Sequence, residues 1–349
     1  MKIATLQFAP RLGDVEGNIR RADELLDGLE RKADLLVLPE MALTGYNFPS
    51  ADAIRPYVEH VGQGRSADWA RKTAKKHGCK VCVGYPEVEK TIASSESTTT
   101  TETYYNSLVV IDPHGSVLVN YRKTFLYMAD EPWAAEGDAG RSFQRLRFGG
   151  EDAQKEKEIA TSFGICMDIN PYKFEAPFTA FEFARRVVDS QTQLVVLSMA
   201  WTTMLPAEEL RALGAQPDLD TFNYWIQRFM PLIREKMAHG ADVDGNGDGT
   251  GDEGAEKRVV LVFANRCGED PAAVEGEEPV RYAGGSTIIA VSQRRRRGLA
   301  ALVGGDDGSD LDVKILCWGM MGAANEGICF ADTEADPEMV FALVKPGGD

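Results

Sequence analysis

The stretch DLLVLPE, residues Asp34 to Glu40, indicates the fold class of this chain. Its apolar residues are continuous rather than alternating with polar ones, which is typical of a strand that is buried on both faces. A segment with apolar residues at helical spacing precedes it, from Asn18 to Lys32, and a second expected helix, from Ser66 to His77, follows it. The next strand is expected in KVCVGYPE, residues 80–87. Helices that alternate with buried strands predict an α/β protein built in layers.

The same alternation continues through the rest of the chain. A hairpin is expected in SLVVIDPHGSVLVNYRK, because Asp-Pro-His-Gly at residues 112–115 is a turn sequence. After it we expect a strand in IATSFGICMD, a helix from Phe178 to Ser190, a strand in QLVVLSMAW, a long helix from Leu219 to Ala238 and two further strands. Because strand patterns resume after each polar interruption, we predict one domain over residues 1–349 with insertions near 91–103, 241–256 and 293–312.

Composition narrows the classes of function. The 349 residues include 54 acidic and 38 basic side chains, a formal charge of −16, and 44% of them are hydrophobic, which is ample for a large core. A field of that sign repels phosphate backbones and anionic lipids, which argues against nucleic-acid and membrane partners. No stretch approaches the ~20 apolar residues that a membrane helix needs. With six scattered cysteines, we expect reduced thiols and a cytoplasmic location.

Two of the cysteines, Cys79 and Cys82, have the CxxC spacing found in many zinc sites. Their segment has the pattern of a strand, however, and residues three apart on a strand point to opposite faces. No second CxxC accompanies the pair. We therefore expect no metal and no cofactor.

Three reactive side chains each follow an expected strand. Glu40 ends DLLVLPE, Lys123 follows the strand in VLVNYRK, and Cys166 ends the apolar run of FGICMDINPYKFEAP, residues 163–177. Taken singly, each has a structural interpretation: a capping or arginine-bound carboxylate, a lysine at a sheet edge, and a buried thiol. For Cys166, the turn residues that directly follow it favour a functional interpretation. A strained corner after a strand exposes a side chain and points backbone N–H groups toward it.

If Cys166 is a nucleophile, it needs a partner other than histidine. No histidine lies within forty residues of it on either side. A free thiol is mostly protonated at neutral pH, so it needs a base or a cation beside it. A glutamate and a lysine can meet that need without histidine.

In this order and in these settings, the three residues resemble the nitrilase superfamily, whose members use a Glu-Lys-Cys triad. The resemblance extends along most of the chain through LVLPEMALTGY, YRKTFLY, GICMDINPYKFEAP and LVVLSMAW. It implies a nitrilase-like α-β-β-α sandwich and an amidohydrolase with a Cys thioester intermediate. YRKTFLY followed by DEPW, and the long ICMDINPYKFEAP, resemble a fungal branch of N-terminal amidases. That branch implies polypeptide substrates with N-terminal Asn or Gln, which it deamidates, and a place in an N-degron pathway.

The resemblance also implies the roles of individual residues. Glu40 is expected to be the general base, and Lys123 is expected to stabilise the oxyanion together with the backbone N–H of Met167. A second carboxylate commonly supports the lysine, for which Glu131 is the first candidate and Asp130 the second. Candidates for binding the substrate and its α-ammonium group are Tyr46, Asn47, Asp168, Glu175, Ser198 and Trp201. Members of this superfamily commonly pair subunits, so a homodimer is compatible with the sequence.

Three alternatives remain open at this point. A Cys/His hydrolase would need one of the four histidines, none of which ends a strand. A calcium-binding module is suggested by DGNGDG, residues 244–249, which matches the first half of an EF-hand loop over 244–255, although its twelfth position is alanine. An amidase or carbamoylase acting on free small molecules would use the same triad, because the triad contacts only the carbonyl group.

Overall fold

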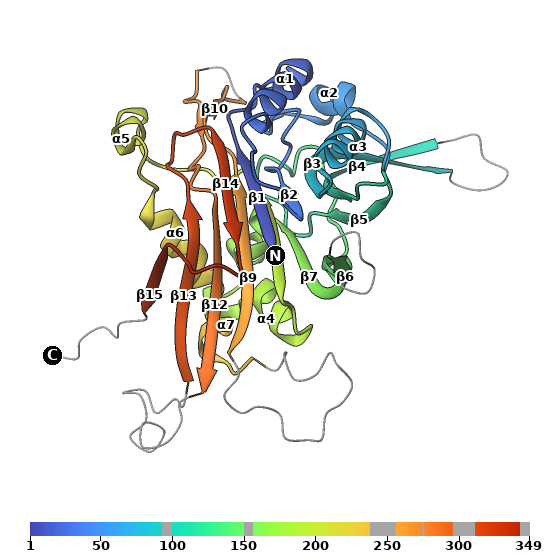
Figure 1. Ribbon diagram of the computed structural model, residues 1–349. Helices are drawn as coiled ribbons and strands as arrows, with labels where there is room; N and C mark the ends of the chain where they lie inside the picture. The colour runs from blue at the N-terminus through green and yellow to red at the C-terminus, as the bar shows by residue number, and fades with distance from the viewer. Residues whose placement is uncertain (93–99, 150–155, 238–255, 274–275, 296–310, 343–349) are drawn as a thin grey trace.

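The computed structural model describes residues 1–92, 100–149, 156–237, 256–273, 276–295 and 311–342. Two large sheets carry the fold (Figure 1). The first has the order β14-β1-β2-β3-β4-β5 and consists of β1 (Lys2–Gln7), β2 (Leu35–Val37), β3 (Lys80–Ile92), β4 (Thr100–Ile111), β5 (Val117–Arg122) and β14 (Gly327–Asp332). The second has the order β15-β13-β12-β9-β8-β7-β6 and consists of β6 (Phe143–Phe148), β7 (Lys157–Ile165), β8 (Leu194–Met199), β9 (Lys257–Asn265), β12 (Thr287–Arg295), β13 (Leu311–Met320) and β15 (Met339–Ala342).

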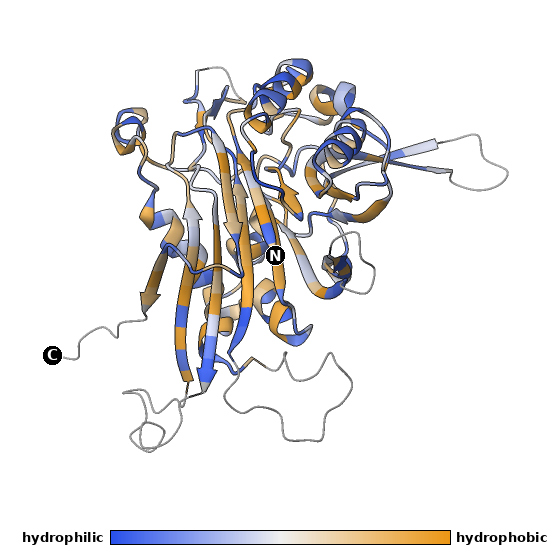
Figure 2. Ribbon diagram, viewed as in Figure 1, coloured by the Kyte–Doolittle hydropathy of each residue, from blue (hydrophilic) through white to orange (hydrophobic). Residues whose placement is uncertain are grey.

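Helices cover the outer faces of both sheets, and a small strand pair lies apart from them. The helices are α1 (Val15–Leu26), α2 (Ala51–Ile54), α3 (Arg65–His77), α4 (Glu182–Asp189), α5 (Ala207–Leu213), α6 (Leu219–Arg228) and α7 (Met230–Arg234), and the small pair is β10 (Glu269–Asp270) with β11 (Val280–Arg281). α1 and α3 pack on the first sheet in one apolar cluster, whereas α4, α6 and α7 belong to the cluster that contains the second sheet. Figure 2 shows hydrophobic residues along the central strands and many hydrophilic ones on α1 and α3.

The structure explains why the apolar residues of DLLVLPE are continuous. Leu35 and Val37 pack in the core between the sheets, together with Phe163 of β7. Leu36 and Leu38 pack in the other cluster, against the helices of the first sheet. A strand with helices on one face and a second sheet on the other has no face left for polar side chains. The architecture is therefore layered α/β, as the strand and helix patterns predicted, and it is the α-β-β-α sandwich that the family resemblance implied.

Three helix predictions need correction. The long helix expected from Leu219 to Ala238 is divided into α6 and α7. Pro231 has no backbone N–H to donate, and its ring would clash with the preceding turn of an uninterrupted helix. The helix expected over residues 18–32 is α1, which starts earlier because Asp14 accepts a hydrogen bond from the N–H of Gly17, and ends at Leu26. The helix expected from residue 178 begins only at Glu182.

The predicted insertions lie partly outside the described residues. β3 continues to Ile92 and β4 begins at Thr100, so strands occupy part of the stretch that we expected to be a loop over 91–103. The EF-hand-like residues 244–255 lie outside the described part, as do residues 296–310. Within the described residues, no helix is long and apolar enough to cross a membrane.

Candidate active site

The two sheets are joined where β2 and β8 end. The backbone N–H of Glu40 donates to the carbonyl of Met199 at 3.3 Å, and the backbone N–H of Ala200 donates to Glu40 Oε2 at 2.8 Å. Ser198 Oγ donates to the carbonyl of Leu38 at 3.0 Å. These bonds fix the end of one sheet against the end of the other, and the residues that follow β5 and β7 lie at the same place.

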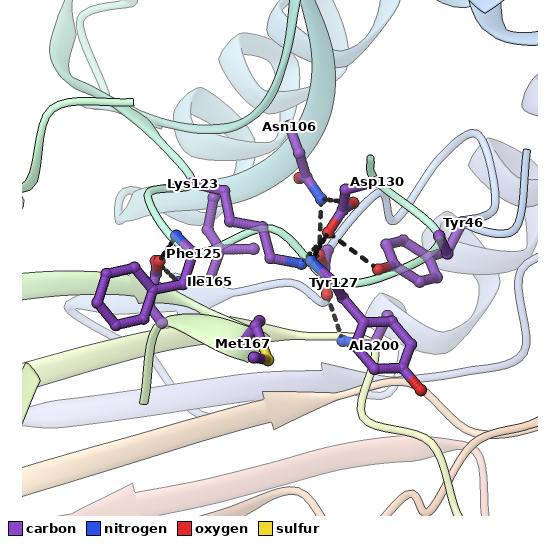
Figure 3. A network of polar contacts seen from close by, with 12 residues as sticks. Tyr46, Asn106, Lys123, Phe125, Tyr127, Asp130, Ile165, Met167 and Ala200 are labelled. Carbon is purple, nitrogen blue, oxygen red and sulfur yellow. Dashed lines mark hydrogen bonds and ion pairs between the residues drawn. The ribbon is translucent and has the colours of Figure 1, made fainter. Parts of the chain in front are cut away.

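Lys123 lies between two buried carboxylates (Figure 3). Its Nζ is 2.6 Å from Glu40 Oε1 and 2.6 Å from Asp130 Oδ2, and all three side chains have no exposed surface. Asn106 of β4 ties the carboxylates together, because its Nδ2 donates to Glu40 Oε1 at 2.7 Å and to Asp130 Oδ1 at 2.9 Å. Burial acts to lower the pKa of Lys123, but the charges of Asp130 and Glu40 outweigh it and raise that pKa, so the ammonium stays charged.

The second carboxylate beside the lysine is Asp130, which was the second candidate, and not Glu131. Asp130 Oδ2 also accepts hydrogen bonds from Tyr46 OH at 3.2 Å and from the backbone N–H of Tyr127 at 2.9 Å. The side chain of Glu131 is exposed. The reason is local. The hydrogen bond to the N–H of Tyr127 holds the Asp130 side chain inward, and the side chain of the neighbouring Glu131 points to solvent.

This arrangement predicts opposite results for two matched substitutions. Asp130→Asn is expected to lower kcat/KM on the order of 10²-fold, because the lysine loses one of the two charges that hold it in place. Glu131→Gln is expected to stay within about twofold of the unchanged chain, since exposed substitutions have small effects. Steady-state kinetics of the two isosteric variants provides the measurement. A loss in Glu131→Gln as large as that in Asp130→Asn would contradict the assignment.

Cys166 lies on a strained turn directly after β7. It begins a short 3-10 helix, Cys166–Ile169, and has a φ of 41°, in the left-handed region that residues other than glycine rarely adopt. Such strain persists only where surrounding contacts maintain it, and it is common at active sites. Cys166 is 8% exposed, so a small part of its surface is open.

Asp168 supplies contacts that maintain this turn. Its carboxylate accepts hydrogen bonds from the backbone N–H of Ile165 at 2.8 Å and from Tyr121 OH at 2.8 Å. It also accepts from the N–H groups of Thr124 and Phe125 and from Thr124 Oγ1. Five protein donors occupy the carboxylate, which argues against the prediction that Asp168 binds the substrate ammonium. It joins the turn of Cys166 to the segment that follows Lys123.

The electrostatics around Cys166 favour the neutral thiol. Burial raises its pKa and so does the negative charge of Glu40, whereas Lys123 and the backbone N–H of Ala200 act in the opposite direction. Burial also raises the pKa of Glu40, although Lys123 opposes this. A protonated thiol beside a carboxylate of raised pKa is the pair that a proton transfer from sulfur to oxygen requires.

The other substrate-site candidates divide into two groups. Tyr46 lies at the site, since its ring centroid is 5.4 Å from the Nζ of Lys123. Trp201 directly follows Ala200, is partly buried, and contacts aromatic rings of α6. Met167, the expected oxyanion donor, directly follows Cys166 in the chain and is buried.

The remaining candidates bind protein groups or solvent. Asn47 Nδ2 donates to the carbonyl of Pro271 at 2.9 Å. Ser198 is fully buried, and its hydroxyl donates to the carbonyl of Leu38, so it joins the two sheets. Glu175 is exposed.

Sequence reasoning missed two buried polar residues that position the site. Asn106, described above, appears in the sequence only as one polar residue within the strand pattern YYNSLVV. Asp270 accepts hydrogen bonds from the backbone N–H groups of Tyr46 and Asn47, both at 3.2 Å, and pairs with Arg266 at 2.8 Å. It fixes the loop after Glu40, and no sequence signal pointed to it.

The fold is the nitrilase-like sandwich, and comparisons with known proteins indicate a hydrolase of carbon–nitrogen bonds. The family model described as "Carbon-nitrogen hydrolase" matches residues 2–170. A protein N-terminal amidase of Schizosaccharomyces pombe is 33% identical over 312 residues, which cover 84% of this chain and 93% of that protein. A protein N-terminal amidase of Saccharomyces cerevisiae is 34% identical over 215 residues, 58% of this chain but only 45% of that protein. The crystal structure of an N-terminal amidase with an Asn-Glu peptide has a TM-score of 0.70 at 23% identity and covers 99% of both chains.

The chain belongs to the carbon–nitrogen hydrolase family, the nitrilase superfamily, and is an amidohydrolase.

Proposed function

We propose that this chain deamidates N-terminal Asn and Gln of polypeptides to Asp and Glu and releases ammonia. The observation that carries the proposal is the similarity to the S. pombe protein N-terminal amidase, 33% identity along 93% of that relative. The site chemistry supports it, because a thiol, a carboxylate and a buried ammonium suit attack on a carboxamide carbon. The product would carry an N-terminal acidic residue, which would place the enzyme in an N-degron pathway.

In the first half of the reaction, the substrate side-chain amide acylates Cys166. Glu40 takes the Sγ proton, and the thiolate attacks the carboxamide carbon. The charge that develops on the oxygen is stabilised by the Lys123 ammonium and the backbone N–H of Met167, donors worth ~3–4 kcal/mol apiece. When the tetrahedral intermediate collapses, the C–N bond breaks and Glu40 returns its proton to the leaving ammonia.

In the second half, water hydrolyses the thioester. Glu40 takes a proton from a water molecule, and the resulting hydroxide attacks the thioester carbon. The same donors stabilise the second oxyanion. The C–S bond then breaks, the Cys166 sulfur recovers its proton from Glu40, and the product leaves as a carboxylic acid that ionises in water.

The raised pKa of Glu40 predicts a distinctive acid limb in the pH profile. Only the carboxylate form accepts the thiol proton, so kcat/KM falls as the pH drops through the pKa of Glu40. Because burial raises that pKa, the midpoint is expected above the ordinary value of about 4.3 for glutamate. Rates measured on one Asn-starting peptide between acidic and neutral pH, with circular dichroism to verify folding, provide the test.

Glu59 offers a matched control for the pH profile. Burial raises its pKa to about 7, and its carboxylate binds Ser66 at the start of α3, away from the catalytic groups. Glu59→Gln should therefore leave the acid limb in place. A limb that disappears in this variant would show that Glu40 is not the group that titrates, and a midpoint at the ordinary glutamate value would show that its pKa is not raised.

A substrate panel tests the proposed function itself. Peptides that start with Asn, Gln or Val, together with free asparagine and glutamine, are incubated with the chain, and mass spectrometry follows deamidation. Cys166→Ala is the control. We expect conversion of the Asn- and Gln-peptides only. Turnover of the free amino acids in place of the peptides would favour an amidase of small molecules and overturn the peptide assignment.

A further inference from the structure

A group of aromatic side chains beside the catalytic turn has no role in the mechanism above. Trp201 directly follows Ala200, whose backbone N–H binds Glu40. Ring centroids of Trp201 and Tyr224 are 5.5 Å apart, and those of Tyr224 and Phe178 are 5.9 Å apart. These three residues are named here the aromatic wall. Trp201 and Tyr224 are partly buried and Phe178 is 42% exposed, so the wall runs from the buried site to the surface.

Polar contacts fix the aromatic wall to the residues that follow the nucleophile. Tyr224 OH donates to Asn170 Oδ1 at 2.7 Å. The buried Arg228 donates from Nε to the carbonyl of Ile169 at 2.7 Å and from Nη1 to the carbonyl of Phe178. Its guanidinium carbon also lies 4.5 Å from the centroid of the Phe178 ring. One arginine side chain therefore spans from the catalytic turn to the exposed end of the wall.

The segment between the catalytic turn and α4 retains unfavourable features. Lys173, Phe174 and Phe181 adopt φ values of 52°, 56° and 48°, in the left-handed region that is costly for residues with a Cβ. Phe174 is 57% exposed, and Phe178 is also open to water. Strained backbone is common at ligand clamps, and neighbouring exposed apolar side chains mark binding surfaces. Both features are typical of a segment that binds an apolar ligand.

We propose that the aromatic wall binds the second residue of the substrate polypeptide and favours an apolar or aromatic side chain there. The inference rests on the proposed function. Once the carboxamide carbon of the first residue is at Cys166, the rest of the polypeptide has to leave the buried site toward solvent. The aromatic wall joins those two places. A large apolar side chain gains contact with its rings, whereas glycine has no side chain to bury.

The test compares peptides of one length that differ only at the second residue. We expect kcat/KM for Asn-Phe and Asn-Leu peptides to exceed that for the Asn-Gly peptide about tenfold, the scale at which apolar pockets discriminate. Phe178→Ala is expected to reduce this ratio to about twofold, and Phe178→Leu to retain most of it. Calorimetry with the Cys166→Ala variant should give the same order of affinities for Asn-Phe and Asn-Gly peptides without turnover.

Phe341 provides a matched control. It is 37% exposed, similar to Phe178, but lies on β15 at the edge of the second sheet. Phe341→Ala is expected to keep the tenfold ratio. Equal rates on all Asn-peptides, or a ratio that survives Phe178→Ala, would overturn the inference while the proposed function stands. Turnover of no peptide at all would overturn both, so the two failures are distinguishable.

Discussion

Replacing Cys166 with alanine is expected to lower kcat on an Asn-starting peptide by at least about 10⁴-fold, the scale seen when a catalytic nucleophile is removed. Without the sulfur no thioester forms. The only reaction left is a direct attack of water on the amide, which Glu40 and Lys123 assist poorly. The fold should persist, because the substitution removes one atom from a side chain that is already at the edge of the core. Product is measured by mass spectrometry, and folding by circular dichroism.

Cys79→Ala is the matched control for loss of a thiol. Cys79 is 1% exposed, and burial raises its pKa to about 11, so it stays protonated and inert. Its removal is expected to leave kcat within about twofold, since it lies in the cluster between the first sheet and its helices. An active Cys166→Ala variant, or an inactive Cys79→Ala variant with intact folding, would refute the assignment of the nucleophile.

Replacing Lys123 with methionine is expected to damage both stability and catalysis. The variant leaves Glu40 and Asp130 buried without a counter-charge, and removing one partner of a buried ion pair typically costs about 3–5 kcal/mol. It also removes the donor proposed for the oxyanion, which lowers kcat by about 10²–10³-fold. Urea unfolding gives the free energy of unfolding, and steady-state kinetics gives kcat.

A double variant separates the two effects. Adding Asp130→Asn to Lys123→Met removes one of the two unpaired carboxylates, so part of the lost free energy of unfolding should return, while kcat stays low because the ammonium is still missing. If the double variant is no more stable than the single one, repulsion between buried carboxylates is not the cause of the instability.

The core of the fold was predictable because its signals are local. Four consecutive apolar residues in DLLVLPE predicted a strand buried on both faces, and the structure divides them alternately between two cores. The ends of strands were also predictable, so Glu40, Lys123 and Cys166 could be selected before any contact was known. The long helix expected from Leu219 to Ala238 is the exception: its apolar pattern is continuous, but Pro231 prevents an uninterrupted helix.

The sequence by itself determined which strands are buried on both faces and which reactive residue follows each catalytic strand. Both depend only on neighbours along the chain. The tertiary structure alone decided which polar residues meet. It selected Asp130 over the adjacent Glu131, because the direction of a side chain in a turn depends on the turn's own hydrogen bonds. It likewise assigned Asp168 to five protein donors and brought Asn106 to Glu40, 66 residues away in sequence. Contacts of that range depend on how the strands are ordered in the sheets and how the sheets join, and no local pattern contains that information.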